Sequence, residues 1–574
     1  MNETEKPVSG LLSDWGEALV KLQIVMPERP ELDGGIMCPA CRMIHGRCHE
    51  AVYPLMCLAA RTGEERYLTS AKKLFRWGEN MLCADGSLRN DAKSDWRGVT
   101  VFGAVALHDA LFYHGDLLTE TERTGWKKRL ERMGAWLSEN LRPGRLQAYL
   151  NYYAANACAM ALLGRYFDRT DYTDLARELA EFCLDRTTDN LLIYGEGHPV
   201  DLKTRKGCRA ADVGGYNVEE TLPSLTRCAF ELDDPEMISS CREIWSAHLE
   251  WMLPDGAWDD SVGSRAFKWT YWGSRTSDGC QDALFLLGKD EPVFAEAALR
   301  NTELLVRCTH DGLLYGGPDY HRHGEKPCVH HTFCHAKALA GSLNNGTYDF
   351  ERTSLPVTDA KCVRRYEDLD VLRVNFGGWI SDVISCDHVA FPGAHASGGT
   401  ISLLWHGKTG PLIACGAPDF RLREPFNQQL PSREDDHRCP CPRLEATAGG
   451  VRLTQYYDLG ALQSRKIGGD NIDVIADASL CDETGNCPDD KFAFSLTYTF
   501  ERDLLRINYC VNAEVKDEVR FVLPVINGGA GVTAERGTMF HEPADFFNLN
   551  PGFMGTEYVF APDEDGMTEI VITV

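Results

Sequence analysis

The chain has 574 residues, too many for one small hydrophobic core, so we expect at least two domains. Hydrophobic residues make up 44% and charged residues 25%, which is typical of a globular protein. The formal net charge of −26 argues against a nucleic-acid partner, because binding to phosphates requires a basic surface. It does not exclude an anionic substrate, which a locally basic pocket can hold.

The first residues and the cysteines predict a cytoplasmic protein. The N-terminal sequence MNETEKPVSGLL lacks the basic and apolar regions of a signal peptide. No apolar run approaches the roughly 18 residues of a membrane span, so we expect no membrane partner. The 22 cysteines lie in apolar stretches, as Cys158 and Cys183 do, where a free thiol acts as a small hydrophobic side chain.

From residue 9 to about residue 343 the apolar residues recur with helical periodicity. Leu175, Leu179 and Phe182 follow the spacing of one helical face. The helices are expected near residues 9–25, 48–62, 65–82, 97–115, 119–141, 148–168, 171–187, 217–231, 234–253, 276–288, 291–309 and 331–343. They come in pairs of similar length with alternating short and long connections. Residues 1–345 are therefore predicted to form an (α/α)6-type helical toroid.

After residue 345 the pattern changes to short β-rich runs between Gly, Pro and Asp clusters. A turn signal at residues 344–347 marks the change. Residues 492–500 and 505–509 alternate with a period of two, and the chain ends on another such run at 569–574. Residues 346–574 are therefore predicted to form an antiparallel β-sandwich domain.

Polar and aromatic residues collect in the connections between the helices. Alternate connections of such a toroid meet at one mouth, and loops on a rigid scaffold tend to carry function. Three of the 12 tryptophans lie within residues 258–272, and five of the 17 histidines within residues 321–335. Aromatic faces beside polar donors suit a sugar ring, and the excess of Arg and His indicates an acidic sugar. The candidate substrate-binding residues are His45, Arg47, His49, Trp96, Tyr152, Trp269, Trp272, Arg275, Asp278 and His331.

The segment from Cys38 to residue 50 has three interpretations. Cys38, Cys41, His45 and Cys48 are ligand types of a zinc site, although their spacing is shorter than usual for a structural site. Alternatively, His45 faces the mouth together with Arg47 and His49, and Arg47 pairs with a substrate carboxylate. The third interpretation is a well-packed loop.

Two other features also allow a structural interpretation. His331 and His335 are four residues apart and suit a metal, but no third ligand is identified. We therefore predict that no metal or other cofactor is required. Asn151 opens an apolar helix, where its amide either caps the helix or bonds to a ligand. The loop of residues 194–220 is long, and long ordered loops are usually functional.

This arrangement resembles the helical toroid plus β-sandwich polysaccharide lyases of the heparinase II/III-like type. Asn151-Tyr152 resembles the motif that neutralises the uronate carboxylate in that group. Glu196-Gly197 followed by Tyr216-Asn217 resembles its tyrosine loop, and His331 or His335 matches its later histidine. The resemblance also extends to residues 398–413, which are similar to the first sandwich strands.

The resemblance implies β-elimination at a uronic acid in an oligosaccharide. Asn151 with Arg47 or His49 would stabilise the aci-carboxylate that forms. Tyr216 would remove the C5 proton if nearby cations favour its phenolate. His335, or Tyr216 itself, would then protonate the leaving oxygen.

Two other functions fit the same residues. One is exo-acting hydrolysis, for example by a β-glucuronidase, with paired carboxylates drawn from Glu196, Asp259, Asp260, Asp278 and Asp319. The other is glycan binding without catalysis. The expected partner is a small acidic oligosaccharide, and the sequence is compatible with a homo-oligomer. Across the two enzymatic alternatives, the candidate catalytic residues are Asn151, Tyr216, His335, Glu196 and Asp259.

Overall fold

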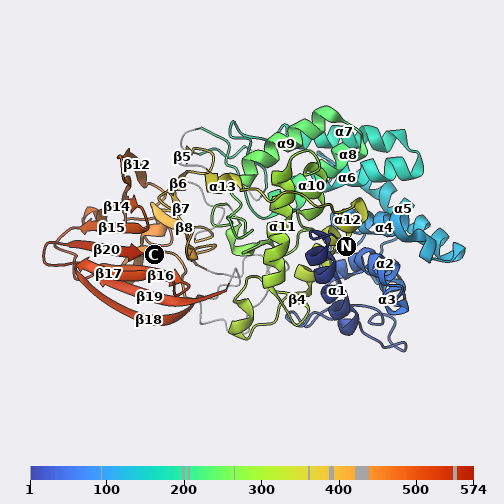
Figure 1. The fold of residues 1–574 in the computed structure, drawn as a ribbon, viewed down its shortest axis with the longest axis horizontal. Helices are drawn as coiled ribbons and strands as arrows, with labels where there is room; N and C mark the ends of the chain where they lie inside the picture. Colours follow the sequence, from blue (N-terminus) through green and yellow to red (C-terminus); the bar gives the residue numbers. More distant parts are fainter. Residues whose placement is uncertain are drawn as a thin grey trace.

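The protein consists of a helical region followed by a β region, which lie side by side along its longest axis (Figure 1). The predicted order of an all-helical part and then an antiparallel β part is therefore confirmed. The structure is a computed structural model. It describes residues 2–91, 94–196, 201–204, 207–263, 265–359, 362–386, 393–419, 438–546 and 552–574.

The helical region contains each of the expected helices. Their ends lie within about five residues of the predicted ones, with the largest shifts at the end predicted near residue 82 and at the starts predicted near residues 217 and 276. The helices are α1 (Glu5–Leu22), α2 (Val52–Thr62), α3 (Glu65–Trp77), α4 (Thr100–His114), α5 (Glu120–Asn140), α6 (Leu150–Phe167), α7 (Thr170–Leu184), α8 (Leu222–Glu231), α9 (Pro235–Leu249), α10 (Gln281–Leu287), α11 (Pro292–Arg307) and α12 (Val329–Asn345).

The even-numbered helices form a closed inner ring. Each contacts the next in the order α2, α4, α6, α8, α10 and α12, and α12 returns to α2. The odd-numbered helices pack outside, α3 on α2 and so on, with α1 on α12. Inner helices such as α4 are buried on nearly all sides, whereas outer α3 buries only one stripe that includes Tyr67, Ala71 and Leu74. These contacts confirm the (α/α)6 toroid.

Local signals fix several helix ends. Thr119 and Glu122 form a capping box at the start of α5, in which each side chain accepts from the other residue's backbone N–H. Asp234 caps α9, whose first residue is Pro235. Gly63, with φ of 73°, ends α2 in the left-handed conformation that glycine adopts at low cost.

The β region contains three antiparallel sheets. The first has the order β5 (Cys362–Tyr366), β6 (Val371–Phe376), β7 (Trp379–Ile384), β8 (Thr400–His406) and β9 (Gly410–Ala414). The second has the order β11 (Val451–Thr454), β10 (Arg443–Ala448), β16 (Arg520–Ile526), β19 (Phe553–Ala561) and β18 (Thr538–Phe546). The third has the order β12 (Leu462–Ile467), β13 (Ile472–Ser479), β14 (Ala493–Glu501), β15 (Leu504–Val511), β20 (Met567–Thr573) and β17 (Gly531–Arg536).

These sheets share one hydrophobic core. In β14 every second residue is buried, as Leu496, Tyr498 and Phe500 are, so one face of the strand points into the core. Leu404 of the first sheet and Phe521 of the second belong to the same core cluster. One departure from the sequence interpretation lies here: Cys481 and Cys487 form a disulfide.

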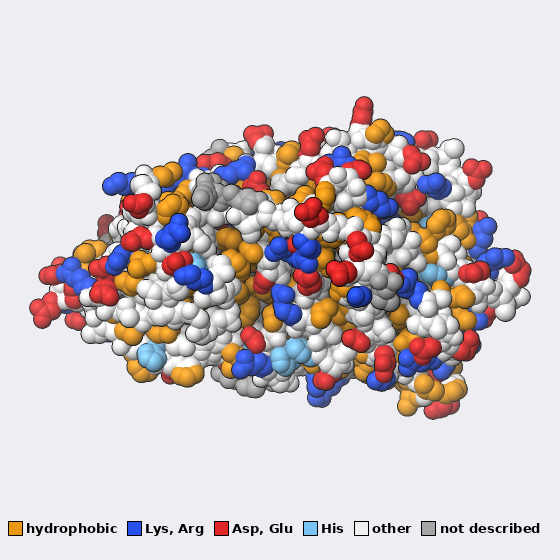
Figure 2. Space-filling view, in the orientation of Figure 1, with side chains coloured by type: hydrophobic (Ala, Val, Ile, Leu, Met, Phe, Trp, Pro, Cys, Tyr) orange, Lys and Arg blue, Asp and Glu red, His pale blue; other side chains and the backbone are white. Residues whose placement is uncertain are grey.

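The long connections before the inner helices contact the β region. Asp259 and Ser261, in the connection before α10, bond to Arg373 and Ser402, and the two serine hydroxyls lie 3.0 Å apart. The N-terminal ends of the inner helices therefore open toward the β region. On the face drawn in Figure 2, acidic and basic side chains are interspersed. No helix in the described part of the chain is both long and apolar enough to cross a membrane.

Candidate active site

Tyr216 lies at the mouth of the ring, immediately before a π-helical turn at Asn217–Thr221 that leads into α8. Lys268 Nζ donates a hydrogen bond to the Tyr216 hydroxyl at 2.8 Å, and Thr276 Oγ1 lies 2.7 Å from that hydroxyl. The Arg265 guanidinium is 5.4 Å from the centre of the tyrosine ring. The Tyr216 side chain is only 7% exposed. A buried phenol with two cations beside it is suited to proton transfer.

Asn151 and Glu220 form a buried pair beside Tyr216. Asn151 occupies the first turn of α6, and its Nδ2 donates to Glu220 Oε1 at 2.9 Å. Its Oδ1 has no hydrogen-bond partner among the described residues. Burial raises the pKa of Glu220 well above its usual range, and the negative charge of Asp278 adds to this effect. A protonated carboxyl and a primary amide can both donate hydrogen bonds to a substrate carboxylate.

Glu196 pairs with Arg265 through a contact of 2.8 Å. Burial raises the pKa of Glu196 to about 7, although the charges of Arg265 and Lys268 oppose that rise. The pair orients the Arg265 guanidinium beside the tyrosine ring. Gly197 of the predicted loop motif lies outside the described residues.

Arg47 is fully engaged within the protein. Its Nε and Nη2 bond to the carboxylate of Glu50 at 2.6 and 2.9 Å, and its Nη1 donates to the Thr276 carbonyl at 2.8 Å. Lys337 of α12 binds Glu50 and lies 2.7 Å from Asp278. The two cations and two carboxylates neutralise one another. This network positions Thr276, whose hydroxyl contacts Tyr216, so we assign Arg47 to support of the site rather than to pairing with a substrate carboxylate.

Three aromatic side chains at the mouth are at least partly exposed. Trp96 Nε1 donates to the Tyr152 hydroxyl at 2.9 Å, and Tyr149 is 44% exposed beside Arg265. The predicted stacking residues Trp269 and Trp272 are instead buried, at 2% and 0% exposure. Trp269 packs edge-on against the Tyr216 ring, with ring centroids 5.0 Å apart, and Trp272 packs against His335.

His331 and His335 lie beneath the mouth on α12. His335 Nε2 lies 3.2 Å from Glu219, which also accepts from Ser274 N–H and from the Ser277 hydroxyl. His331 Nδ1 lies 3.1 Å from the Leu314 carbonyl, and burial lowers the pKa of His331 to about 3. Both histidines are buried; through Glu219, His335 supports the loop that carries Thr276, whereas His331 is held against the Leu314 carbonyl.

Four other predicted residues lie outside the Tyr216 cluster. Asp259 is fully buried against Arg373 of the β region. His49 Nδ1 lies 2.6 Å from the Gly46 carbonyl, and burial lowers its pKa. Arg275 and His45 both contact the sulfur of Cys328, so they belong to a second cluster.

The structure thus brings together part of the predicted site and adds residues to it. The predicted members that meet around the mouth are Asn151, Tyr152, Glu196, Tyr216, Trp269, Asp278, Arg47 and Trp96. The additional members are Glu220, Arg265, Lys268 and Thr276. Arg265 and Lys268 belong to the polar, tryptophan-rich segment that the sequence analysis identified. Their contact with Tyr216, which the sequence does not show, distinguishes them from the other charged residues of that segment.

Comparison with known families agrees with this architecture. Residues 12–358 match the ulvan lyase N-terminal domain and residues 363–540 match the ulvan lyase C-terminal domain. The chain belongs to the ulvan lyase family. It is 35% identical over 535 residues to the broad-specificity ulvan lyase of Formosa agariphila, a match that covers 91% of this chain and 83% of that protein. This lyase family confirms the prediction of a polysaccharide lyase that cleaves uronate glycosides by β-elimination.

Solved structures confirm the fold. Heparinase III has a TM-score of 0.50 and 10% identity, over 92% of this chain and 76% of that chain. The chondroitin AC lyase of Streptomyces coelicolor A3 has a TM-score of 0.53 and 12% identity, over 100% of this chain and 80% of that chain. At such low identity the likeness concerns the toroid and the β region alone.

Proposed function

We propose that this lyase cleaves ulvan, with Tyr216 as the base that starts the elimination. Ulvan is the substrate named for the relative in Formosa agariphila. The observation that carries the assignment of the base is the contact between Tyr216 and Lys268, 2.8 Å long and largely closed to solvent. An ammonium at this distance favours the phenolate, which a base needs at neutral pH.

The reaction begins at the uronate C5–H bond. The Tyr216 phenolate takes the C5 proton, and the electron pair moves into the adjacent carboxylate, which becomes an aci-carboxylate. Asn151 donates a hydrogen bond to that group, Glu220 does so when its carboxyl carries a proton, and the Arg265 charge stabilises it. These donors are buried and held in place before substrate arrives, so little reorganisation is needed during the reaction.

The second half of the reaction breaks the bond between C4 and the bridging oxygen. The electron pair returns to form the C4–C5 double bond, and the oxygen leaves with a proton. Tyr216 has just gained a proton at the correct place and is hydrogen-bonded to Lys268, so it returns that proton to the leaving oxygen. Trp96, Tyr149 and Tyr152 present aromatic faces and hydroxyls on which neighbouring sugars bind.

Hydrolysis is less consistent with these contacts. It requires two carboxyl groups that flank the scissile bond. Glu196 is bound to Arg265, and Asp259 is enclosed between Ser261 and Arg373. Each of these two carboxylates is thus held in an ion pair with a buried arginine.

The experiment incubates the purified full chain with ulvan and with short uronate oligosaccharides. Elimination yields products with ultraviolet absorbance from the new double bond, and their masses sum to the mass of the substrate. Hydrolysis would add one water to that sum and no absorbance. Products that carry the extra water would overturn the assignment of Tyr216, and cleavage of the oligosaccharides but not ulvan would overturn the polymeric substrate.

A further inference from the structure

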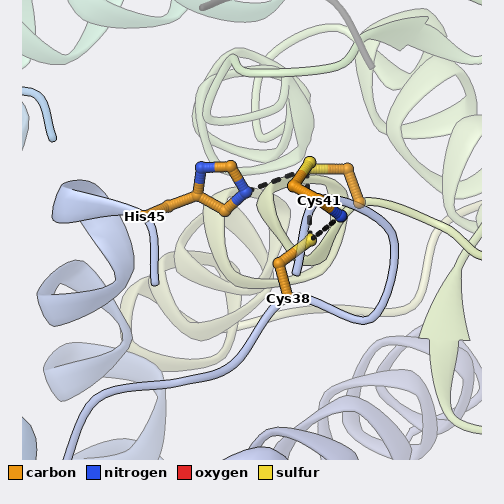
Figure 3. Close-up of side chains that lie close together, drawn as sticks. Cys38, Cys41 and His45 are labelled. Carbon is orange, nitrogen blue, oxygen red and sulfur yellow. Dashed lines mark hydrogen bonds between the residues drawn. The ribbon is translucent and has the colours of Figure 1, made fainter. Parts of the chain in front are cut away.

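A second cluster of reactive side chains lies where the first and the last inner helices of the ring, α2 and α12, meet. Cys38, Cys41, His45 and Cys328 each direct one ligand atom to a common point, and these atoms all lie within 4.8 Å of one another. Figure 3 shows the side chains of Cys38, Cys41 and His45 pointing toward one another. Nothing in the elimination chemistry uses three thiols and an imidazole.

The three distances from Cys328 Sγ to the other ligand atoms are those of a tetrahedral metal site. With Zn–S bonds of about 2.3 Å and a Zn–N bond of about 2.0 Å, two sulfurs lie about 3.8 Å apart and a sulfur and a nitrogen about 3.5 Å apart. Cys328 Sγ lies 3.8 Å from Cys38 Sγ and 3.7 Å from Cys41 Sγ. Its distance to His45 Nε2 is 3.5 Å. A disulfide would instead require about 2.05 Å between two sulfurs.

Hydrogen-bond donors approach two of the sulfurs. The backbone N–H groups of Cys41 and Val329 donate to Cys38 Sγ at 3.3 and 3.4 Å. Arg275 Nη2 donates to Cys328 Sγ at 3.3 Å. Three thiolates and a neutral histidine around Zn²⁺ carry a net charge of −1, which the Arg275 guanidinium offsets. Donors of this kind orient ligands and tune a metal site.

The chain folds locally to present these ligands. Met37 and Ile44 pair across a tight turn, in which Arg42 adopts a φ of 52° and donates its N–H to the Cys38 carbonyl at 3.0 Å. This turn brings the sulfurs of Cys38 and Cys41 to the same side. The remaining cysteine, Cys328, immediately precedes α12, the last inner helix of the ring.

We propose that Cys38, Cys41, His45 and Cys328 form a structural zinc site. All four positions are filled by protein atoms, so the site has no open position for catalysis. The metal would join the segment before α2 to the start of α12, 290 residues further along the chain, and so fasten the first inner helix to the last. Cys328, rather than the Cys48 considered from the sequence, supplies the fourth ligand.

A second group of candidate ligands provides a contrast. Glu50, Asp278 and Cys334 also lie close together. The two carboxylates, however, already bind Arg47 and Lys337. Among the described residues, the sulfur cluster has one hydrogen bond from a cationic side chain, which Arg275 donates to Cys328. Its ligand atoms are therefore not occupied by ion pairs as the two carboxylates are.

The test measures metal in the untagged full chain, expressed in zinc-supplemented medium and purified without chelators. Elemental analysis is expected to give about one zinc per chain. The zinc content of the variants Cys328→Ser and Cys41→Ser should be at least tenfold lower than that of the wild type. Cys48→Ser and Cys334→Ser are matched controls, because both cysteines are buried nearby but lie outside the cluster, and they should keep it.

A second measurement keeps the proposal testable if the cysteine variants do not fold. The wild-type chain, reduced, stripped of metal and reconstituted with Co²⁺ under anaerobic conditions, should show the intense visible bands of tetrahedral cobalt with thiolate-to-metal charge transfer. Absence of both zinc and these bands would overturn the site. So would an equal loss of zinc from Cys48→Ser and Cys328→Ser, or a disulfide within the cluster in the freshly purified chain.

Discussion

Lys268 Nζ and the Tyr216 hydroxyl are 2.8 Å apart at the mouth of the helical ring. The two residues come from different connections, one before α8 and one before α10, which meet because the inner helices are parallel neighbours. The hydroxyl is held from its other side by Thr276. Its position is therefore set by two side chains before any substrate binds, as preorganised catalysis requires.

Replacement of Tyr216 by phenylalanine should remove the base and leave the fold intact. We expect kcat on ulvan to fall by about 10²- to 10⁴-fold, the usual contribution of a positioned proton-transfer group. Ultraviolet absorbance of the unsaturated product measures the rate, and thermal unfolding checks the fold. Tyr166→Phe, at the far end of α6, is the control and should keep wild-type activity. A Tyr216→Phe enzyme that retains more than about a tenth of the rate would exclude this base.

Removal of the Lys268 charge should shift the pH dependence of the rate. The ammonium favours the phenolate, so Lys268→Met should move the rise of activity to higher pH and lower the rate most strongly at neutral pH. Lys268→Arg keeps the charge and should move the profile less. The measurement is kcat/KM across pH for the three proteins. Three superimposable profiles would show that Lys268 does not act on the base.

The helices of the ring could be predicted from the sequence because each outer helix exposes one face to solvent. Tyr67, Ala71 and Leu74 repeat with the helical period, and solvent on the other side keeps that pattern clear. The start of α10 was predicted too early, near residue 276, because the residues before Gln281 are held by side-chain contacts instead. Ser277, for example, donates to Glu219 from a connection far away in sequence. Periodicity does not register such contacts.

The sequence predicted which connections form the site, but it predicted less well which residues of these connections belong to it. Asn151 and Tyr216 follow short motifs, whereas Glu220 and Lys268 join the site only through contacts between separate connections. The concentration of tryptophans marked the segment that meets Tyr216, because Trp269 packs edge-on against the tyrosine ring, whereas Trp272 packs deeper, with its Nε1 donating to the Tyr315 carbonyl. The same limit hid Cys328, which lies 283 residues from His45.

Replacement of Glu196 by glutamine should change how stability depends on pH. The pKa of Glu196 is raised from 4.5 to about 7 in the folded protein, chiefly by burial. Below 4.5 the carboxyl is protonated in both states. Between these values the unfolded chain releases the proton first, so the free energy of unfolding of the wild type should fall, relative to Glu196→Gln, by up to about 3 kcal/mol. Above about pH 7 the difference should stay constant.

Thermal unfolding of the wild type and of Glu196→Gln from about pH 4 to about pH 8 measures this difference in stability. The range covers the pKa of Glu196 in the unfolded and in the folded chain. Parallel stability curves would contradict the raised pKa. Activity of the same variant separates the two chemistries: a lyase with Tyr216 as base should retain part of its rate in Glu196→Gln, whereas a hydrolase that uses Glu196 as its acid should not.

Replacement of Asp259 by alanine should destabilise the contact between the two regions without removing the chemistry. Asp259 accepts from Ser261 at 2.6 Å and from Arg373 at 2.8 Å, and Arg373 also binds Asp382 of the β region at 2.6 Å. Loss of one partner of a buried ion pair costs about 3–5 kcal/mol, and we expect the lower end because Asp382 still pairs with Arg373. Denaturant unfolding measures this loss.

The control for this change is Asp171→Ala, which breaks the exposed pair with Arg169 and should alter stability by less than about 0.5 kcal/mol. The KM of Asp259→Ala should stay close to that of the wild type, since no group of the Tyr216 cluster contacts this carboxylate among the described residues. If Asp259 were instead a catalytic carboxylate, Asp259→Asn would abolish the rate while stability stayed high. The ratio of lost activity to lost stability thus decides between a residue that joins two domains and one that breaks a bond.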